Sequence, residues 1–243
     1  SQADYFQATK GGGHGDYHLI VLAPSSVQEM ADFVYLGFDL AFKYRTPAMI
    51  LADGIVGQMM EKVVLPPARA RRTDEEIAAQ CPWAVTGKNG RGHANVMTTL
   101  ELNSELMEKH NERYQQTYRL IEENEVRYQE YYTEDAEYVI VAFGSVARIC
   151  LKAIEEARQK GVKVGLIRPI TLWPFPTKRM AELAAQTKGM LCVELNAGQM
   201  IEDVRLAVNG AVPVYHFGRM GGIVPTPQEV IDAFNEKFNE AKK

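Results

Sequence analysis

The sequence predicts an α/β protein that ends in a doubly wound parallel sheet. After residue 134, apolar runs of strand length alternate strictly with amphipathic stretches of helix length. Such alternation favours parallel strands that are covered by helices on both faces. The first sixty residues follow the same order in one βαβ unit. With 46% hydrophobic and 24% charged residues among 243, the chain has the composition of a globular protein and not of a disordered one.

The first unit places a helix over residues 27–44 between strands at residues 17–23 and 47–52. Ser26 marks the start of this helix, because its hydroxyl can accept a bond from the first turn while Glu29 reaches back to it as in a capping box. Most of the helix surface is apolar, so the helix must be buried on more than one side. The cover would come from residues upstream of this chain, from another subunit, or from the rest of a larger α/β domain.

The middle of the chain lacks a clear period. Residues 62–95 combine the pair Pro66-Pro67, a basic group and three glycines, and such a long irregular connection is typical of a linker or a functional segment. Residues 100–132 then predict one long, mostly polar helix with a thin apolar seam. We expect this helix to be a connector that packs along one side.

The second half predicts four strands and four helices. The strands are expected at residues 138–143, 162–167, 190–194 and 212–216, and the helices at residues 146–160, 177–187, 200–209 and 227–240. The last helix has the clearest start, with Thr226 as N-cap, Pro227 in the first turn and Glu229 as the capping-box acid. This half should form an independent doubly wound domain.

Composition excludes several classes of function. The net charge of −4 gives no basic surface for nucleic acid or an anionic membrane. No apolar run is long enough for a membrane span, and the first residues lack the apolar core of a signal peptide, so a cytoplasmic location is expected. The three cysteines lie far apart, which argues against a disulfide framework, a zinc site or an iron–sulfur site, and no metal-ligand spacing is present. The chain starts without Met and reaches a buried strand early, so we expect it to be a fragment.

The most unusual string is a glycine-rich loop that also presents a histidine and an aspartate. Its residues are Gly11, Gly12, Gly13, His14, Gly15 and Asp16. Glycines let a backbone approach a ligand closely, but the loop precedes a strand and lacks the Lys-Ser/Thr of a phosphate loop. The residues therefore leave two interpretations open, a ligand-binding loop and a flexible surface turn, and they favour the turn.

Asp53 and Gly54 follow the strand at residues 47–52, at the edge where α/β sheets usually bind ligands. Asp53 could be a catalytic acid at this edge. Asp-Gly is also a common turn pair, and the Met residues that follow are typical of contact surfaces. A turn that docks on a partner is the favoured interpretation.

Four further residues at strand ends of the second half could form an anion site. They are Ser145, Arg148, Arg168 and Arg219. Ser145 opens a helix, whose N-terminal amides favour negative charge. The alternative is a purely structural edge, in which Arg168 pairs with Glu194. The residues alone favour this structural role.

Several strings, taken in order, resemble the alpha subunit of 2-oxoacid:ferredoxin oxidoreductases. They read GGGHGDYHLIVLAPSSVQEM, LADGIVGQMMEKV, VAFGSVARI, RPITLWPFP and VELNAGQM. The resemblance covers essentially the whole chain. It implies that residues 1–66 are the second half of a pyrimidine-binding domain, that residues 67–134 are a linker and connector helix, and that residues 135–243 are a transketolase-C-terminal-like domain. The chain would thus begin in the middle of that subunit.

The resemblance implies an enzyme that decarboxylates a 2-oxoacid oxidatively with thiamine diphosphate, forms an acyl-coenzyme A, and passes electrons through iron–sulfur clusters to ferredoxin. In the family the clusters and the magnesium–diphosphate site belong to partner subunits, which here would be a thiamine-diphosphate-binding beta subunit, a gamma subunit and a ferredoxin-like subunit. The main catalytic residues belong to the first half of the pyrimidine domain, so none is assigned to this chain, and the chain alone is expected to be inactive.

The resemblance does imply where two parts of this chain lie relative to the thiamine. The Gly11–Asp16 loop and Asp53 belong to the domain that covers the thiamine, so they are expected to line the cleft. The GQMM string is most similar to subunits that act on branched-chain oxoacids such as 2-oxoisovalerate, or on 2-oxoglutarate, and the former is preferred. Two alternatives stay open: a non-catalytic assembly module of a complex, and a transketolase-like or 2-oxoacid-dehydrogenase-like subunit.

Overall fold

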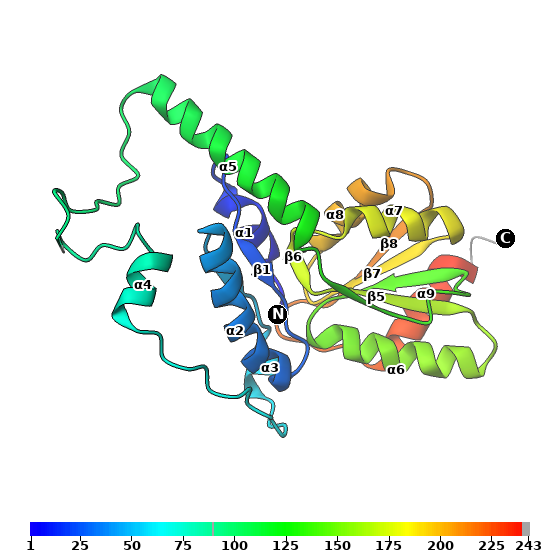
Figure 1. Ribbon diagram of the computed structural model, residues 1–243. Helices are drawn as coiled ribbons and strands as arrows, with labels where there is room; N and C mark the ends of the chain where they lie inside the picture. Colours follow the sequence, from blue (N-terminus) through cyan, green and yellow to red (C-terminus); the bar gives the residue numbers. More distant parts are fainter. Residues whose placement is uncertain (89, 240–243) are drawn as a thin grey trace. The chain divides into compact units, whose positions relative to one another are not determined.

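The computed structural model describes residues 1–88 and 90–239. The chain divides into two compact units (Figure 1). The first unit combines residues 1–64 with residues 115–243, and the second comprises residues 65–114. The first unit therefore joins segments that the sequence analysis assigned to separate domains, and the predicted boundaries near residues 66 and 134 stay a prediction.

The larger sheet of the first unit has the strand order β3-β5-β4-β7-β8. Its strands are β3 (Tyr128–Tyr131), β4 (Tyr138–Val141), β5 (Val164–Pro169), β7 (Met190–Glu194) and β8 (Val214–Gly218). The last four are parallel, and only β3 runs antiparallel, against β5. The central strands β4, β5 and β7 are buried and mostly apolar, with one charged residue near the end of β5 and one at the end of β7, as expected for a sheet with two covered faces.

Helices cover both faces of this sheet (Figure 1). One face packs against α6 (Ser145–Gln159) and α9 (Pro227–Asn239), and the other against α7 (Thr177–Gln186) and α8 (Met200–Val208). The capping box at the start of α9 is present, because Thr226 and Glu229 exchange side-chain and backbone bonds. The predicted α/β class with a doubly wound sheet is thus confirmed, while the predicted helix end at residue 240 lies outside the described residues.

A smaller sheet, of order β2-β1-β6, carries the first residues of the chain. It comprises β1 (Ile20–Leu22), β2 (Ala48–Ile50) and β6 (Thr171–Trp173), and short helices α1 (Tyr5–Thr9) and α3 (Gly54–Gln58) flank it together with α2 (Val27–Tyr44). β1 and β2 are parallel, whereas β6 joins antiparallel. The βαβ unit is as predicted. The hydroxyl of Ser26 accepts from the amide of Glu29, but the carboxylate of Glu29 bonds to Ser25 instead of Ser26, which corrects the predicted box.

The connector differs from its prediction at both ends. Helix α5 spans Ser104–Asn124, so it begins four residues later than predicted, and the strand β3 lies where its last turns were predicted. Within residues 65–114, the irregular connection holds one short helix, α4 (Asp74–Gln80), which starts with a capping box between Thr73 and Glu76. Residue 89, which the same prediction included, lies outside the described residues.

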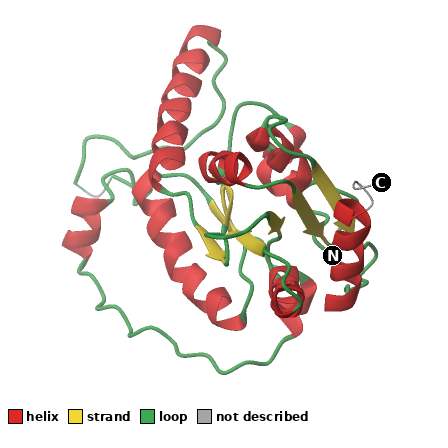
Figure 2. Ribbon diagram, turned by 90° about the vertical axis from the view of Figure 1, so that its right-hand side faces the viewer, coloured by secondary structure: helices red, strands yellow, loops and turns green. Residues whose placement is uncertain are grey.

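Helix α2 keeps an apolar stripe at its surface. Phe33, Gly37 and Leu40 are buried, but Val34 is 43% exposed and Phe38 is 64% exposed. The helix was predicted to be buried on more than one side, but within the described residues only one of its sides is buried. Figure 2 shows α2 from a second direction as one of the long helices.

One prediction arises where α5 ends. Glu125 is buried and accepts hydrogen bonds of 2.6 Å from both the ammonium of Lys43 and the hydroxyl of Tyr44, and its other oxygen lies 2.8 Å from Arg127. Burial by itself would raise the pKa of this carboxyl, but these donors outweigh burial and lower the pKa from 4.5 to about 2. The carboxylate therefore ties α2 to the connector.

Because its pKa is lower in the folded chain, Glu125 stabilises the fold fully above pH 4.5 and loses that contribution as the pH falls toward 2. We expect Glu125→Gln to lower the free energy of unfolding at pH 7 by about 2 kcal/mol and to flatten its decline below pH 4.5. Denaturant unfolding between pH 2.5 and 7 measures this. Glu123→Gln, which changes an exposed neighbour, should leave the pH profile unchanged, and an equal effect of both variants would contradict the assignment.

Candidate functional site

The predicted site residues gather mainly where the parallel strands end. Asp53 follows β2, Ser145 and Arg148 follow β4, Arg168 lies at the end of β5, and Arg219 follows β8. This carboxyl edge is where open α/β sheets usually bind ligands. The position of each group is therefore as the sequence indicated, and its partners decide what it can do.

Asp53 is a shared cap for two helices. Its Oδ1 accepts from the backbone amides of Ile55 and Val56 in α3, at 3.2 and 3.1 Å. Its Oδ2 accepts from the amide of Ser145, at 2.9 Å, where α6 begins. The side chain is buried, with only 6% of the residue exposed. A carboxylate held by three amides is a fixed anion at two helix N-termini, which supports the turn interpretation over that of a catalytic acid.

The close approach of α6 to Asp53 depends on Gly144. Its φ of +62° lies in the left-handed region, and a Cβ there would come within 2.7 Å of the Asp53 carboxylate. Gln2 bonds to the carbonyl of Phe143 at 2.9 Å and to Asp53 at 3.4 Å. The first residues of the chain thus belong to this edge.

Arg168 forms the most buried ion pair of the edge. The residue is 2% exposed, and its guanidinium donates two bonds of 2.7 and 2.8 Å to the carboxylate of Glu29. Further bonds of 2.8 Å run to the Ser25 hydroxyl and the Gln129 side chain. The predicted pairing of Arg168 with Glu194 is wrong, because β4 separates β5 from β7 and the two side chains leave from different strands.

The other two arginines of the predicted anion edge also hold carboxylates. Arg148 pairs with Glu61 at 2.7 Å, and Arg219 pairs with Glu229 at 2.6 Å. An incoming anion would have to displace these acids or bind beside them. The anion site stays a prediction, and its geometry favours the structural alternative.

Glu194 fills the end of β7 with negative charge. It is fully buried, and its oxygens accept from the amides of Met200 and Ile201 at 2.8 and 3.1 Å, at the start of α8. Asn196 donates a third bond of 3.0 Å. His216 lies 3.8 Å away, and burial lowers the pKa of this imidazole although Glu194 acts in the opposite direction. The acid is thus an anchor for α8.

The glycine-rich loop lies apart from these groups. Gly11, Gly12 and Gly13 all have positive φ values, and a Cβ on Gly11 would lie 3.1 Å from the carbonyl of Tyr17. The residues from Gly13 to Asp16 are exposed. The loop precedes β1, whereas Asp53 follows the parallel strand β2, so the two predicted cleft walls lie at opposite ends of this strand pair. Their role beside a thiamine stays a prediction.

Thiamine diphosphate is normally held through a divalent metal, which takes oxygen ligands. Among the described residues, no group of three His, Cys, Asp or Glu gathers to hold a metal ion. The acids of the carboxyl edge already accept from amides or guanidinium groups. The described residues therefore do not fit a metal–diphosphate site by themselves. In the same part of the chain, no helix is long and apolar enough to span a membrane.

Sequence reasoning missed two of the groups that build this edge. Gln2 links the start of the chain to Leu195. Its side-chain oxygen accepts from the backbone amide of Leu195 at 3.1 Å, and its backbone amide donates to the carbonyl of Leu195. No local sequence pattern at Gln2 predicts these bonds. Glu29 had a signal, since a capping-box acid was expected there, but its carboxylate turns toward Arg168. Only the fold brings β5 beside α2.

Two family models match this chain. Residues 1–130 match the family model described as pyruvate flavodoxin/ferredoxin oxidoreductase, thiamine diphosphate-binding. Residues 136–230 match the model described as pyruvate:ferredoxin oxidoreductase core domain II. The first match alone covers more than half of the chain.

Individual relatives point the same way. The ketoisovalerate oxidoreductase subunit VorB of Methanothermobacter marburgensis is 44% identical over 240 residues, which are 99% of this chain and 66% of that protein. The 2-oxoglutarate synthase subunit KorA of Methanocaldococcus jannaschii is 35% identical over 95% of this chain and 66% of that protein. The chain thus spans slightly less than two thirds of the length of these relatives.

A solved structure shows the same fold. It is a 2-oxoglutarate:ferredoxin oxidoreductase from Magnetococcus marinus with 2-oxoglutarate, coenzyme A and succinyl-CoA bound, and it matches with a TM-score of 0.70 at 22% identity, over 96% of this chain and 44% of that one. At this identity the match concerns the fold alone. Together with the two family models and the relatives, it leads to one conclusion: the chain belongs to the family of 2-oxoacid:ferredoxin oxidoreductase subunits.

Proposed function

We propose that this chain is part of the subunit of a thiamine diphosphate-dependent enzyme that converts a branched-chain 2-oxoacid such as 2-oxoisovalerate to an acyl-coenzyme A and reduces ferredoxin. The observation that carries the proposal is a difference in identity. Two ketoisovalerate oxidoreductase subunits are 44% and 45% identical over nearly the whole chain. The 2-oxoglutarate synthase subunits reach only 30–35%.

The proposed role of this chain is to build one side of the assembly. Thiamine diphosphate would supply the carbanion chemistry of decarboxylation, while its metal, the iron–sulfur clusters and coenzyme A would be held with partner subunits. The described residues contribute fixed geometry: Asp53 joins α3 to α6, and Gln2 ties the chain start to the ends of β4 and β7. This arrangement supports a positioning role, and we expect the chain to be inactive by itself.

The native complex tests the proposal. It would be captured with an antibody against this chain, supplied with thiamine diphosphate and Mg²⁺, and assayed for coenzyme A-dependent reduction of a viologen dye. We expect reduction with 2-oxoisovalerate at a higher kcat/KM than with 2-oxoglutarate. The reverse order would overturn the branched-chain assignment and keep the reaction class.

Two other outcomes would favour the alternatives. An intact multi-subunit complex that reduces no dye with either oxoacid would favour a non-catalytic assembly module. Decarboxylation that needs lipoamide, or no electron acceptor, would favour a dehydrogenase-like or transketolase-like subunit. The acceptor therefore separates the three functions in one set of assays.

A further inference from the structure

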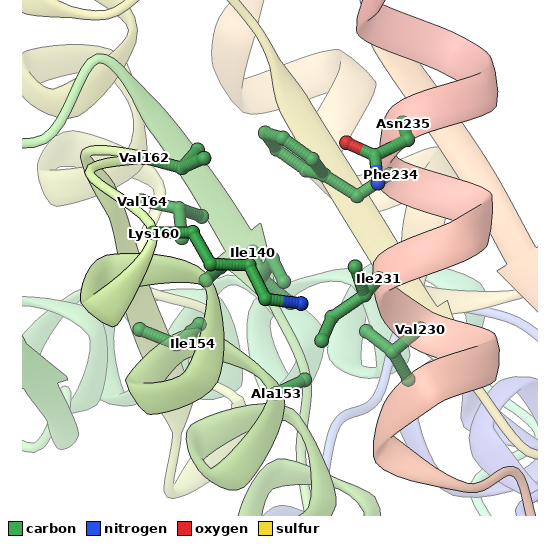
Figure 3. Close-up of a pocket in the computed structure, with 11 residues that line it drawn as sticks. Ile140, Ala153, Ile154, Lys160, Val162, Val164, Val230, Ile231, Phe234 and Asn235 are labelled. Atoms are coloured by element: carbon green, nitrogen blue, oxygen red, sulfur yellow. The ribbon is translucent and has the colours of Figure 1, made fainter.

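A small cavity lies between α6, α9 and the larger sheet, away from the carboxyl-edge groups described above. Its volume is about 120 Å³. Figure 3 shows its walls: Ile140 and Val164 come from the sheet, Ile154 from α6, and Ile231 and Phe234 from α9. These side chains are all apolar and nearly or fully buried. Apart from Asn235 and Lys160, all residues of the lining are apolar, so the interior offers mainly apolar contacts.

The space exists because α6 presents small side chains to α9. Ala153 and Ala157 line the cavity, and they are 1% and 7% exposed. Larger residues at these two positions would fill the gap, which native cores usually do, since interiors are close-packed. An apolar group that fills this space would gain packing contacts with these side chains.

The entrance carries a single charge. Lys160, at the end of α6, is the one ionisable residue of the lining. Figure 3 shows its side chain lying across the cavity with the nitrogen directed toward Ile231 of α9. Only the backbone of Lys160 is engaged, donating to Ala157 and Arg158, and its ammonium forms no ion pair with any residue that the structure describes. An ammonium in this position can pair with an anion at the entrance.

Size and charge together define the ligand. An apolar cavity of about 150 Å³ binds benzene, so about 120 Å³ suits a branched group of three to five carbons. A second charge would have to enter the apolar interior, where no partner compensates it. We propose that this cavity is a binding site for a short branched monocarboxylate, with its alkyl group inside and its carboxylate on Lys160. The site does not depend on the proposed function, because no residue of it belongs to the carboxyl edge.

Ligand-observed NMR on the whole chain tests the proposal with isobutyrate as the probe. We expect saturation transfer to the methyl groups of isobutyrate and a Kd of about 1 mM, as befits a ligand of six heavy atoms. Isobutanol, which lacks the charge, and succinate, which carries two, should both bind at least about five-fold more weakly. Absence of transfer at about 20 mM isobutyrate, or succinate binding as tightly as isobutyrate, would overturn the proposal.

Variants locate the binding. Lys160→Gln should weaken isobutyrate about five-fold and leave isobutanol unchanged, whereas Ala153→Leu should fill the cavity and abolish binding of both. Lys163→Gln is the matched control, since Lys163 is an exposed lysine nearby that does not line the cavity, and it should bind like the parent chain. Should Ala153→Leu fail to fold, the difference between Lys160→Gln and Lys163→Gln still decides. Equal binding by these two lysine variants would overturn the assignment of the carboxylate to Lys160.

Discussion

Glu194→Gln is expected to lower the free energy of unfolding by about 3 kcal/mol, which corresponds to a fall in Tm of roughly 10 °C for a chain of this size. The reason is that both oxygens of Glu194 face donors. One accepts from Met200 and the other from Ile201. A glutamine must turn its NH₂ group toward one of these amides, so a buried donor loses its partner. Thermal and denaturant unfolding of the whole chain at pH 7 measure the effect.

The expected loss of stability depends on the burial of Glu194 and not on its charge alone. Glu202→Gln removes an acid from the first turn of the same helix, α8, but Glu202 is exposed. Its loss should cost less than about 1 kcal/mol, the usual contribution of an exposed acid at a helix N-terminus. If Glu194→Gln were as mild as Glu202→Gln, the anchoring of α8 by Glu194 would be wrong.

The sequence predicts the sheet well because long, regular elements carry their own signal. Strand β7 lies where its apolar run predicts, over residues 190–194, and its neighbours β4 and β5 shift by only two residues at their ends. All three are buried on both faces, so nearly every position is apolar, and the charged residues Arg168 and Glu194 lie only at the carboxyl ends of β5 and β7. Such strands can be predicted from the apolar run alone, without knowledge of their neighbours in the fold.

The elements that were missed depend on distant partners. Strand β6 has three residues between two prolines and exists because it pairs with β1, about 150 positions earlier in the chain. Strand β3 is polar and half exposed at the sheet edge, and Tyr128 continues the helical spacing of the connector. Local pattern therefore extended the helix over it.

The candidate site was predictable in place but not in pairing. Strand ends identified Asp53, Arg148 and Arg168 as edge residues, because parallel strands bring their carboxyl ends together. Their acids come from other segments, such as Glu61 after β2 and Glu29 in α2. The partner of each arginine depends on the order of the strands and the path of the loops, and neither can be predicted from the local sequence.

The second large effect concerns the pair Arg168–Glu29. Arg168→Met should lower the free energy of unfolding by about 3 kcal/mol, because it leaves a partly buried carboxylate without its guanidinium. The single variant Glu29→Gln should also destabilise, since it leaves the buried Arg168 charge uncompensated. The double variant should recover at least about 1.5 kcal/mol relative to the sum of the two. Denaturant unfolding of the four chains gives this coupling energy.

A surface pair serves as the control for this cycle. Arg148 and Glu61 are also an arginine and a carboxylate joined at 2.7 Å, but the side chain of Arg148 is 48% exposed. Their coupling should stay below about 1 kcal/mol, as is usual for exposed ion pairs. Equal coupling energies in the two cycles would show that burial does not strengthen the Arg168–Glu29 pair and would contradict the prediction.

The pH dependence gives an independent check on the same pair. Burial alone would raise the pKa of Glu29, but bonds from Arg168 and Ser25 outweigh burial, and the pKa is lowered from 4.5. A lowered pKa in the folded chain means that the contribution of Glu29 is complete above pH 4.5 and is lost as the pH falls below it. In Arg168→Met the main donor is gone, so burial should prevail and the loss should begin at a higher pH. A stability profile of this variant that bends at the same pH as the parent chain would mean that Arg168 does not hold Glu29 in its charged form.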